Sequence, residues 1–241
     1  MTPLDRHERG ALQFSGGKDS LALVYLLRPH WNKLTIYHVD TGDLLPEVRE
    51  IVSMVEAMVP DFRRIDTDST TFMHTFGLPT DLRPCSSTAI GLSLGLSKQR
   101  LVDRFDCCAF NLMKPMHDRM VADRVPLVIR GTKRADTDRM AAVSGDTSLG
   151  YELWLPLQDW SHDEVFEYLR AVDAPICRIY EHRVNSPECA TCPAWTDERR
   201  ASYLKQFHPE LYQLYRVKLR TVGAELAPWI EGYRSELEHT R

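Results

Sequence analysis

The chain has 241 residues, of which 43% are hydrophobic and 27% charged, a composition typical of a soluble globular protein. It contains no apolar run near the roughly 20 residues that a membrane-spanning helix needs, and its first residues include no apolar stretch of the signal-peptide kind. The formal net charge of −4 argues against a strongly basic nucleic-acid-binding protein. The sequence therefore predicts a cytoplasmic protein without a membrane partner.

Apolar runs alternate with helical patterns along the first two-thirds of the chain, which is typical of βαβ units. The expected strands cover residues 11–14, 34–39, 62–65, 125–129 and 151–155. The expected helices cover residues 20–27, 46–58 and 161–171, the last with a capping box. Residues 66–104 are rich in Thr, Ser, Pro and Gly and are expected to form loops with one short helix. These patterns predict an α/β fold, with a doubly wound, Rossmann-like parallel sheet and helices on both faces.

The last part of the chain has a different character. Two helical patterns, at residues 197–207 and 210–238, carry many Arg, Lys and Tyr residues. We expect residues 1–195 to form the main domain and residues 196–241 a helical C-terminal extension. Basic and aromatic residues on this extension could bind nucleic acid. Because glutamates share the segment, a solvated helix whose apolar side packs on the protein is the alternative.

The segment Ser15-Gly16-Gly17-Lys18-Asp19-Ser20 lies between the first expected strand and the first expected helix. Glycines let the backbone approach a phosphate closely, and the free N–H groups at a helix start bind anions. The serines and Lys18 add donors and a positive charge. The segment does not have the spacing of a Walker A loop. It predicts a phosphate-binding loop, against the alternative of a glycine turn with an exposed lysine.

Two further loops follow expected strands and should lie near this one, because ligands of open parallel sheets bind beyond the carboxyl ends of the strands. Asp40 is expected to contact ribose or adenine or to hold Mg²⁺, with a simple turn aspartate as the alternative. Arg134 and its basic neighbours follow the expected strand at 125–129. The predicted nucleotide- and phosphate-binding residues outside the first loop are Asp40, Thr41, Gly42, Arg130, Gly131, Lys133 and Arg139.

Six cysteines are present, which in a reducing compartment indicates metal or redox chemistry. Cys107 and Cys108 are adjacent, and Cys189 and Cys192 form a C-x-x-C, so together they offer four thiolates. An iron–sulfur cluster and a structural zinc both use four cysteines, although adjacent ligands suit the small zinc ion poorly. An arrangement without metal is the third alternative. Cys85 and Cys177 are expected to serve packing.

Four stretches resemble, in the same order, the PP-loop ATP pyrophosphatases, in particular their phosphoadenylyl-sulfate (PAPS) and adenylyl-sulfate reductase branch. They are the loop at 15–20, His38–Gly42, Arg130–Arg139 and the Pro-Leu-x-x-Trp segment at 155–165. The resemblance covers about residues 11–195. It implies an adenine nucleotide alpha hydrolase-like fold, ATP or a sulfonucleotide (adenylyl sulfate or PAPS) as ligand, and a [4Fe-4S] cluster on the four cysteines. It also implies catalytic roles for Lys18, Asp40 and Arg134.

The reductases of this family carry a nucleophilic cysteine in a short Cys-Gly motif near the C-terminus, whereas this sequence has no cysteine after Cys192. We therefore expect ATP-dependent adenylation coupled to sulfur transfer, that is, thiolation. A sulfonucleotide reductase that uses Cys85 or Cys177 as its nucleophile is the first alternative. A non-catalytic, nucleotide-switched component of a nucleic-acid-acting complex is the second. Thioredoxin or a cysteine desulfurase is the expected electron or sulfur donor, and self-association is the expected oligomeric behaviour.

Overall fold

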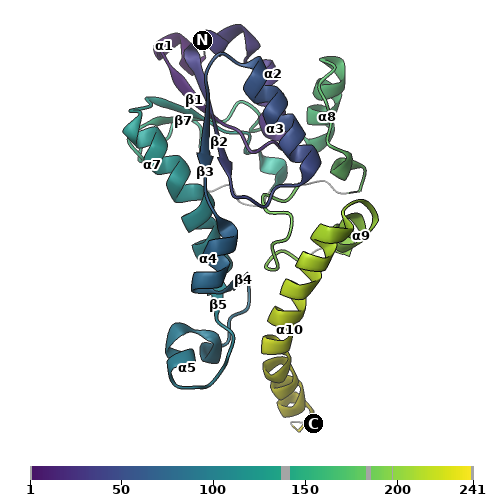
Figure 1. Ribbon diagram of the computed structural model, residues 1–241. Helices are drawn as coiled ribbons and strands as arrows, with labels where there is room; N and C mark the ends of the chain where they lie inside the picture. The colour runs from purple at the N-terminus through teal and green to yellow at the C-terminus, as the bar shows by residue number, and fades with distance from the viewer. Residues whose placement is uncertain (1, 137–141, 183–185, 197, 240–241) are drawn as a thin grey trace. The chain divides into compact units, whose positions relative to one another are not determined.

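The computed structural model describes residues 2–136, 142–182, 186–196 and 198–239 (Figure 1). The chain divides into two compact units, which are described separately below. The first unit comprises Met1–Asp40, Leu44–Thr67 and Lys114–Glu188, and the second comprises Thr41–Asp43, Asp68–Met113 and Cys189–Arg241. The expected domain boundary at residue 195 stays a prediction, because the two compact units do not divide the chain at that residue.

The first unit is built on a five-stranded sheet in the order β3-β2-β1-β6-β7. All four neighbouring pairs are parallel, and Leu12 in the central strand pairs with Ile36 on one side and Ile129 on the other. The strands are β1 (Gly10–Gln13), β2 (Leu34–Asp40), β3 (Phe62–Asp66), β6 (Leu127–Ile129) and β7 (Glu152–Trp154). This order confirms the predicted doubly wound parallel sheet, and each expected strand is present.

Helices cover both faces of this sheet. Figure 1 shows α7 on one side and α2, α3 and α8 on the other. The α-helices are α1 (Pro3–Arg6), α2 (Lys18–Leu26), α3 (Pro46–Met58), α7 (Lys114–Ala122) and α8 (His162–Ala171). The 3-10 turns are η1 (Arg28–Lys33), η4 (Arg134–Asp136) and η5 (Arg178–Glu181).

Local sequence explains where two of these helices begin. Pro46 occupies the first position of α3, where its missing N–H costs nothing, and the buried side chains of α3 recur at helical spacing. In α8, Ser161 accepts from the backbone N–H of Glu164, whose carboxylate accepts from the N–H of Ser161. The predicted capping box is therefore confirmed.

The second unit contains more regular structure than the sequence suggested. Its elements are α4 (Ser69–Phe76), β4 (Leu78–Thr80), η2 (Cys85–Ser87), α5 (Ala89–Ser93), β5 (Leu101–Asp103), α6 (Arg104–Cys108), the π-helical turn η3 (Ala109–Met113), α9 (Glu198–Phe207) and α10 (Pro209–Glu238). Strands β4 and β5 form a parallel pair. The expectation of loops with one short helix over 66–104 was therefore wrong. Strand β4 contains Pro79, and neither β4 nor β5 lies in a longer apolar run. Both helices there start at side-chain caps, Asp68 and Thr88.

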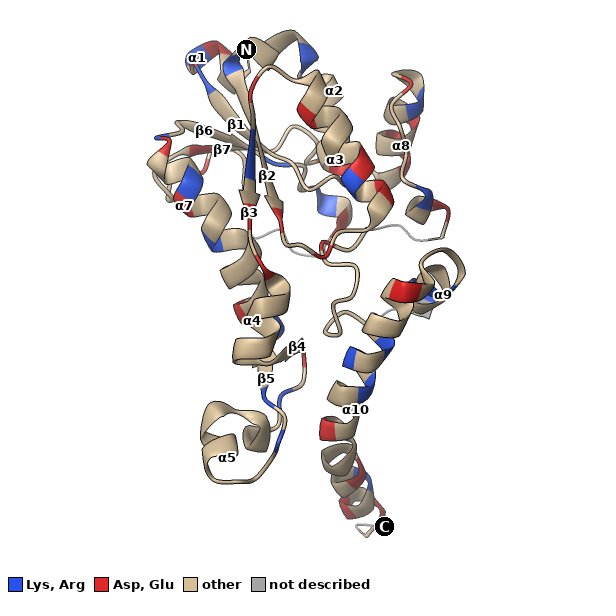
Figure 2. Cartoon of the chain, in the orientation of Figure 1, with Lys and Arg blue, Asp and Glu red and all other residues tan. Residues whose placement is uncertain are grey.

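The C-terminal helices confirm the predicted helical extension. Within α10, both signs of charge are present (Figure 2). Tyr215 and Val222 are its buried residues, and most side chains after residue 226 are exposed. Such a mixture of charges resembles the solvated helix more than a basic nucleic-acid surface. Within the part of the chain that the structure describes, no helix combines the length and apolarity that crossing a membrane would require.

His38 in β2 is a buried titratable group of the first unit. Its side chain is 1% exposed, its Nδ1 lies 2.8 Å from the carbonyl oxygen of Phe14, and the rings of Phe14 and Phe62 flank it. Burial lowers the pKa of His38, although the bond to Phe14 opposes this shift. His38 therefore stays neutral in the folded protein at a pH where the same side chain in the unfolded chain accepts a proton.

Stability should consequently fall as the pH is lowered below the unfolded pKa of about 6.5. The unfolded state binds more protons than the folded state in that range, so the free energy of unfolding decreases toward pH 5. We expect His38→Asn to lose less stability than the wild type between pH 7 and pH 5. Urea unfolding at pH 7, 6 and 5 measures the difference, and equal losses in both proteins would show that His38 does not cause the effect.

Candidate functional site

The predicted phosphate loop lies between β1 and α2, at the switch point of the sheet, since β1 has β2 on one side and β6 on the other. Gly16 adopts a φ of +84°, and a Cβ there would lie 2.8 Å from Cγ1 of Val48 in α3. Gly131, in the loop after β6, packs against the first turn of α2, so that a Cβ would lie 3.0 Å from the carbonyl carbon of Asp19. Both glycines therefore let backbone segments approach closely.

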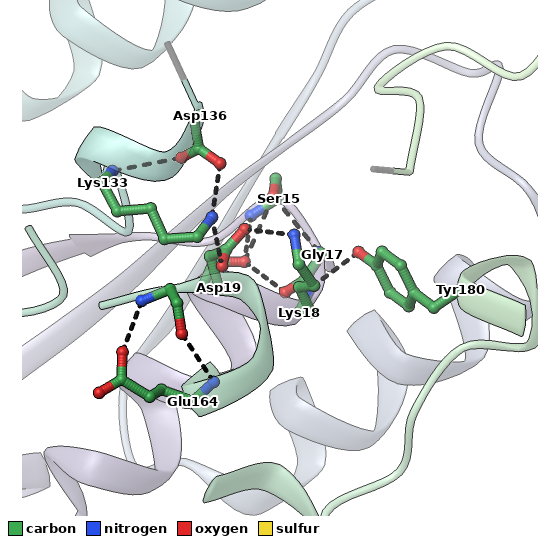
Figure 3. Close-up of polar contacts among 10 residues, drawn as sticks. Ser15, Gly17, Lys18, Asp19, Lys133, Asp136, Glu164 and Tyr180 are labelled. Atoms are coloured by element: carbon green, nitrogen blue, oxygen red, sulfur yellow. Dashed lines mark hydrogen bonds and ion pairs between the residues drawn. The ribbon is translucent and has the colours of Figure 1, made fainter. Parts of the chain in front are cut away.

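Hydroxyl oxygens accept hydrogen bonds from three backbone N–H groups of this loop. The backbone N–H of Ser15 donates to Oγ of Ser20 at 3.2 Å, and the N–H of Gly17 donates to Oγ of Ser15 at 3.3 Å. The N–H of Lys18, the first residue of α2, donates to the phenolic oxygen of Tyr180 at 2.8 Å (Figure 3). Hydroxyl oxygens thus accept from N–H groups of the kind that bind anions at a helix start. The sequence motif contains the two serines but not Tyr180.

Two buried lysines lie beside the loop and share a carboxylate. Nζ of Lys18 lies 2.9 Å from Oδ2 of Asp19, and Nζ of Lys133 lies 2.9 Å from Oδ1 of the same residue. Lys133 also contacts Oδ1 of Asp136 at 2.5 Å (Figure 3). The two lysine side chains are 1% and 0% exposed. Each positive charge therefore has a carboxylate partner, which is what burial of an ammonium group requires.

Burial lowers the pKa of Lys18, against the opposing effect of Asp19. Its Nζ also lies 5.4 Å from the ring centroid of Tyr180 and 5.9 Å from that of Phe166, distances at which aromatic rings attract a cation. His162, the first residue of α8, has its pKa lowered by burial and by both lysines. Its Nδ1 is buried and has no partner in the described part of the chain. This ring therefore lies within electrostatic range of both lysines, although the sequence motif does not mark it.

The remaining predicted residues of the first unit have different surroundings. Asp40, at the end of β2, lies 3.2 Å from Arg49 and 3.5 Å from Arg64. Arg130 has a buried Nε without a hydrogen-bond partner in the residues that the structure describes. Arg134 is 65% exposed and pairs with Asp159 at 2.7 Å. Arg139 lies outside the described residues. The catalytic roles expected for Asp40 and Arg134 stay predictions.

Thr41, Gly42 and Asp43 belong to the second unit, where they are tied to the C-x-x-C segment. The N–H of Ala190 donates to the carbonyl oxygen of Asp43 at 2.6 Å. The Asp43 carboxylate accepts from the N–H of Thr191 at 3.0 Å and from its hydroxyl at 2.7 Å. Oγ1 of Thr41 lies 3.4 Å from Sγ of Cys189. The loop that follows β2 is therefore fixed to the cysteine-bearing segment.

The other two predicted metal ligands end helix α6 and precede the π-helical turn η3. Asn111 in this turn donates from Nδ2 to the carbonyl oxygen of Cys107 at 3.0 Å and to its Sγ at 3.6 Å. Burial, Cys108 and Cys192 together raise the pKa of Cys107 to about 12. Cys108 and Cys192 therefore lie near enough to Cys107 to influence its titration.

Across the described ranges, no three or more His, Cys, Asp or Glu side chains form a group that could hold a metal ion. The four-cysteine ligand set stays a prediction. Cys177 is buried, as expected for a packing role, and burial raises its pKa to about 11. Cys85 is exposed, so the packing role expected for it was wrong.

Comparisons with known proteins agree with this geometry. The model of the phosphoadenosine phosphosulfate reductase domain matches residues 90–194. No curated protein sequence matches the chain. A solved structure of phosphoadenylyl-sulfate (PAPS) reductase from Candida auris, in a phosphate complex, has a TM-score of 0.53 and 14% identity. The match covers 74% of this chain and 80% of that one.

The NH3-dependent NAD synthetase of Campylobacter jejuni subsp. jejuni NCTC 11168, in complex with nitrate, aligns over 89% of this chain and 85% of its own, with 11% identity and a TM-score of 0.46. The predicted phosphate loop at residues 15–20 lies outside the residues that match the family model. Its position at the end of β1 is known from the fold alone. Over residues 90–194, therefore, the chain matches the phosphoadenosine phosphosulfate reductase domain, and it shares its fold with a solved PAPS reductase.

Proposed function

We propose that this protein is a PP-loop enzyme that binds ATP and adenylates an acceptor, with release of pyrophosphate. The observation that carries the proposal is the buried pair Lys18 and Lys133 beside the first turn of α2. A helix N-terminus with two adjacent ammonium groups suits the most highly charged part of a nucleotide. The family match and the shared fold support the choice of an adenylyl nucleotide.

In the proposed reaction, a nucleophilic atom of the acceptor attacks the α-phosphorus of ATP. A bond from that atom to phosphorus forms, the bond from phosphorus to the oxygen bridging to the β-phosphate breaks, and pyrophosphate leaves with the electron pair. Lys18, Lys133 and the loop amides would stabilise the charge that develops on the leaving group. Asp19 and Asp136 hold the two ammonium groups in position before the ligand arrives.

We propose further that Cys107, Cys108, Cys189 and Cys192 hold a [4Fe-4S] cluster that supports sulfur transfer to the adenylated acceptor. Support for this proposal comes from the presence of all four cysteines in one unit and from the influence of Cys108 and Cys192 on the pKa of Cys107. Asn111 and Thr41 place polar groups at two of the sulfurs, and such contacts tune bound clusters. When bound, a cluster of this kind could supply electrons or a labile site for sulfur.

Two measurements test these proposals separately. Exchange of labelled pyrophosphate into ATP, dependent on an added acceptor, tests adenylation, and absence of exchange with every acceptor would contradict it. Anaerobic purification tests the cluster, which should yield about four irons and four sulfides per chain. Cys107→Ser together with Cys108→Ser should remove the iron, whereas the matched control Cys85→Ser should retain it. Purified protein that contains zinc but no iron would indicate a structural metal site instead of a redox cluster.

A sulfonucleotide reductase is the second candidate, favoured by the family match. The thiolate of Cys85 would attack the sulfate sulfur of adenylyl sulfate or PAPS, giving an S-sulfonated cysteine and releasing AMP or its 3′-phosphate. A dithiol reductant such as thioredoxin would then release sulfite and become a disulfide. Cys85 is the better candidate, because it is exposed, whereas Cys177 is buried with a raised pKa. Sulfite release that survives Cys85→Ser would exclude this route.

We propose a cysteine desulfurase as the sulfur donor. Self-association of the chain and nucleic-acid binding by α9 and α10 are two further proposals, each with its own test.

A further inference from the structure

Tyr180 contacts the phosphate loop from a distant part of the sequence. It lies in η5, 162 residues after Lys18, and its phenolic oxygen accepts the Lys18 N–H at 2.8 Å. The same oxygen lies close to Gly17, since a Cβ added to that glycine would be 3.2 Å from the oxygen. Figure 3 shows the ring pointing at the start of α2. Both the amide and the glycine surface that a phosphate would use are thus covered.

The ring is held firmly in this place. Its edge contacts Phe166 of α8, with ring centroids 5.5 Å apart, and Lys18 lies over both rings. Burial raises the pKa of Tyr180, so the phenol stays neutral at physiological pH. A neutral oxygen satisfies one N–H group but adds no charge to the site. It is therefore a weaker acceptor than a phosphate oxygen at the same amide.

An anion cannot use the Lys18 N–H while the phenol accepts it at 2.8 Å. The two serine hydroxyls belong to the loop itself and can rotate away from the amides. The Tyr180 hydroxyl can leave the Lys18 amide only if the whole side chain moves. We propose that Tyr180 competes with the nucleotide's phosphate for the Lys18 N–H and gives way when an anion binds. This inference rests on the proposed function only in taking the loop to be the phosphate site.

Removal of the hydroxyl separates this role from simple packing. Tyr180→Phe keeps the ring and its contact with Phe166, but removes the phenolic oxygen that accepts the Lys18 N–H. An unmade buried hydrogen bond raises the free energy of the empty state alone. Pyrophosphate should therefore bind about 3- to 10-fold more tightly to Tyr180→Phe than to the wild type. In the ligand-free variant, the Lys18 amide should also exchange its hydrogen faster.

Calorimetric titration with inorganic pyrophosphate tests the affinity, and amide hydrogen exchange tests the contact. Tyr168→Phe is the matched control, because Tyr168 lies on α8 and its ring packs against Trp160. Tighter binding by Tyr180→Phe with unchanged binding by Tyr168→Phe is the expected result. Equal or weaker binding by Tyr180→Phe, with a wild type that binds, overturns the inference. If none of the three proteins binds pyrophosphate, the proposed function of the loop itself fails.

Discussion

Replacing Lys133 by methionine is expected to abolish measurable pyrophosphate binding and to lower the free energy of unfolding by about 3 kcal/mol. The side chain is 0% exposed and lies between Asp19 and Asp136. Methionine fills a similar volume but leaves Asp136 without its cation and Asp19 with Lys18 alone. The site would change from electrically balanced to negative, and a negative site repels an anion. Urea unfolding and calorimetric titration measure the two effects.

A second substitution distinguishes the loss of stability from the loss of binding. Adding Asp136→Asn to Lys133→Met removes the uncompensated carboxylate, so part of the lost stability should return while pyrophosphate binding stays absent. Lys205→Met is the control for loss of one positive charge, because Lys205 lies exposed on α9. It should leave both measurements unchanged. Pyrophosphate binding at wild-type strength by Lys133→Met would show that this lysine takes no part in the site.

Asp43→Ala should lower the free energy of unfolding by about 2–3 kcal/mol and reduce the iron content of anaerobically purified protein. The carboxylate accepts from both the N–H and the hydroxyl of Thr191, which is 1% exposed. Lys218 donates to the same hydroxyl at 2.6 Å and lies 4.0 Å from Asp43. Alanine would remove the acceptor of the buried Thr191 N–H and hydroxyl, within the C-x-x-C segment.

Asp43→Asn retains one acceptor oxygen and should fall between alanine and the wild type. Asp163→Ala removes an exposed carboxylate of α8 and should change neither stability nor iron content. Iron at the wild-type level in a destabilised Asp43→Ala would mean that the loop after β2 and the cysteine segment are joined for stability only. The four-cysteine proposal would then stand without a role for this loop.

Local patterns in the sequence predicted the main sheet well. The expected helix over 46–58 has those bounds in the structure, because Pro46 and the spacing of buried residues both mark it. The motif also predicted Lys18 and Lys133 as anion-binding residues. Strands β4 and β5 escaped prediction because neither lies in a longer apolar run and β4 contains Pro79.

Partners from distant segments could not be predicted in the same way. Nothing in the sequence around Tyr180 marks it as the acceptor for the Lys18 amide, because that contact depends on how η5 packs. The pairing of Lys133 with Asp19 likewise depends on the crossover that brings the loop after β6 beside α2. The sequence motif predicts which groups bind an anion, whereas the fold decides which other groups contact them.

The interleaving of the two units has a consequence for synthesis on the ribosome. The central strand β1 gains its second neighbour only when β6 has been made, more than a hundred residues later. By then Asp68–Met113 of the second unit has emerged, yet its remaining large segment, Cys189–Arg241, comes last. Neither unit can therefore finish folding before most of the chain exists. Nascent chains of this protein should need protection from aggregation for most of their elongation.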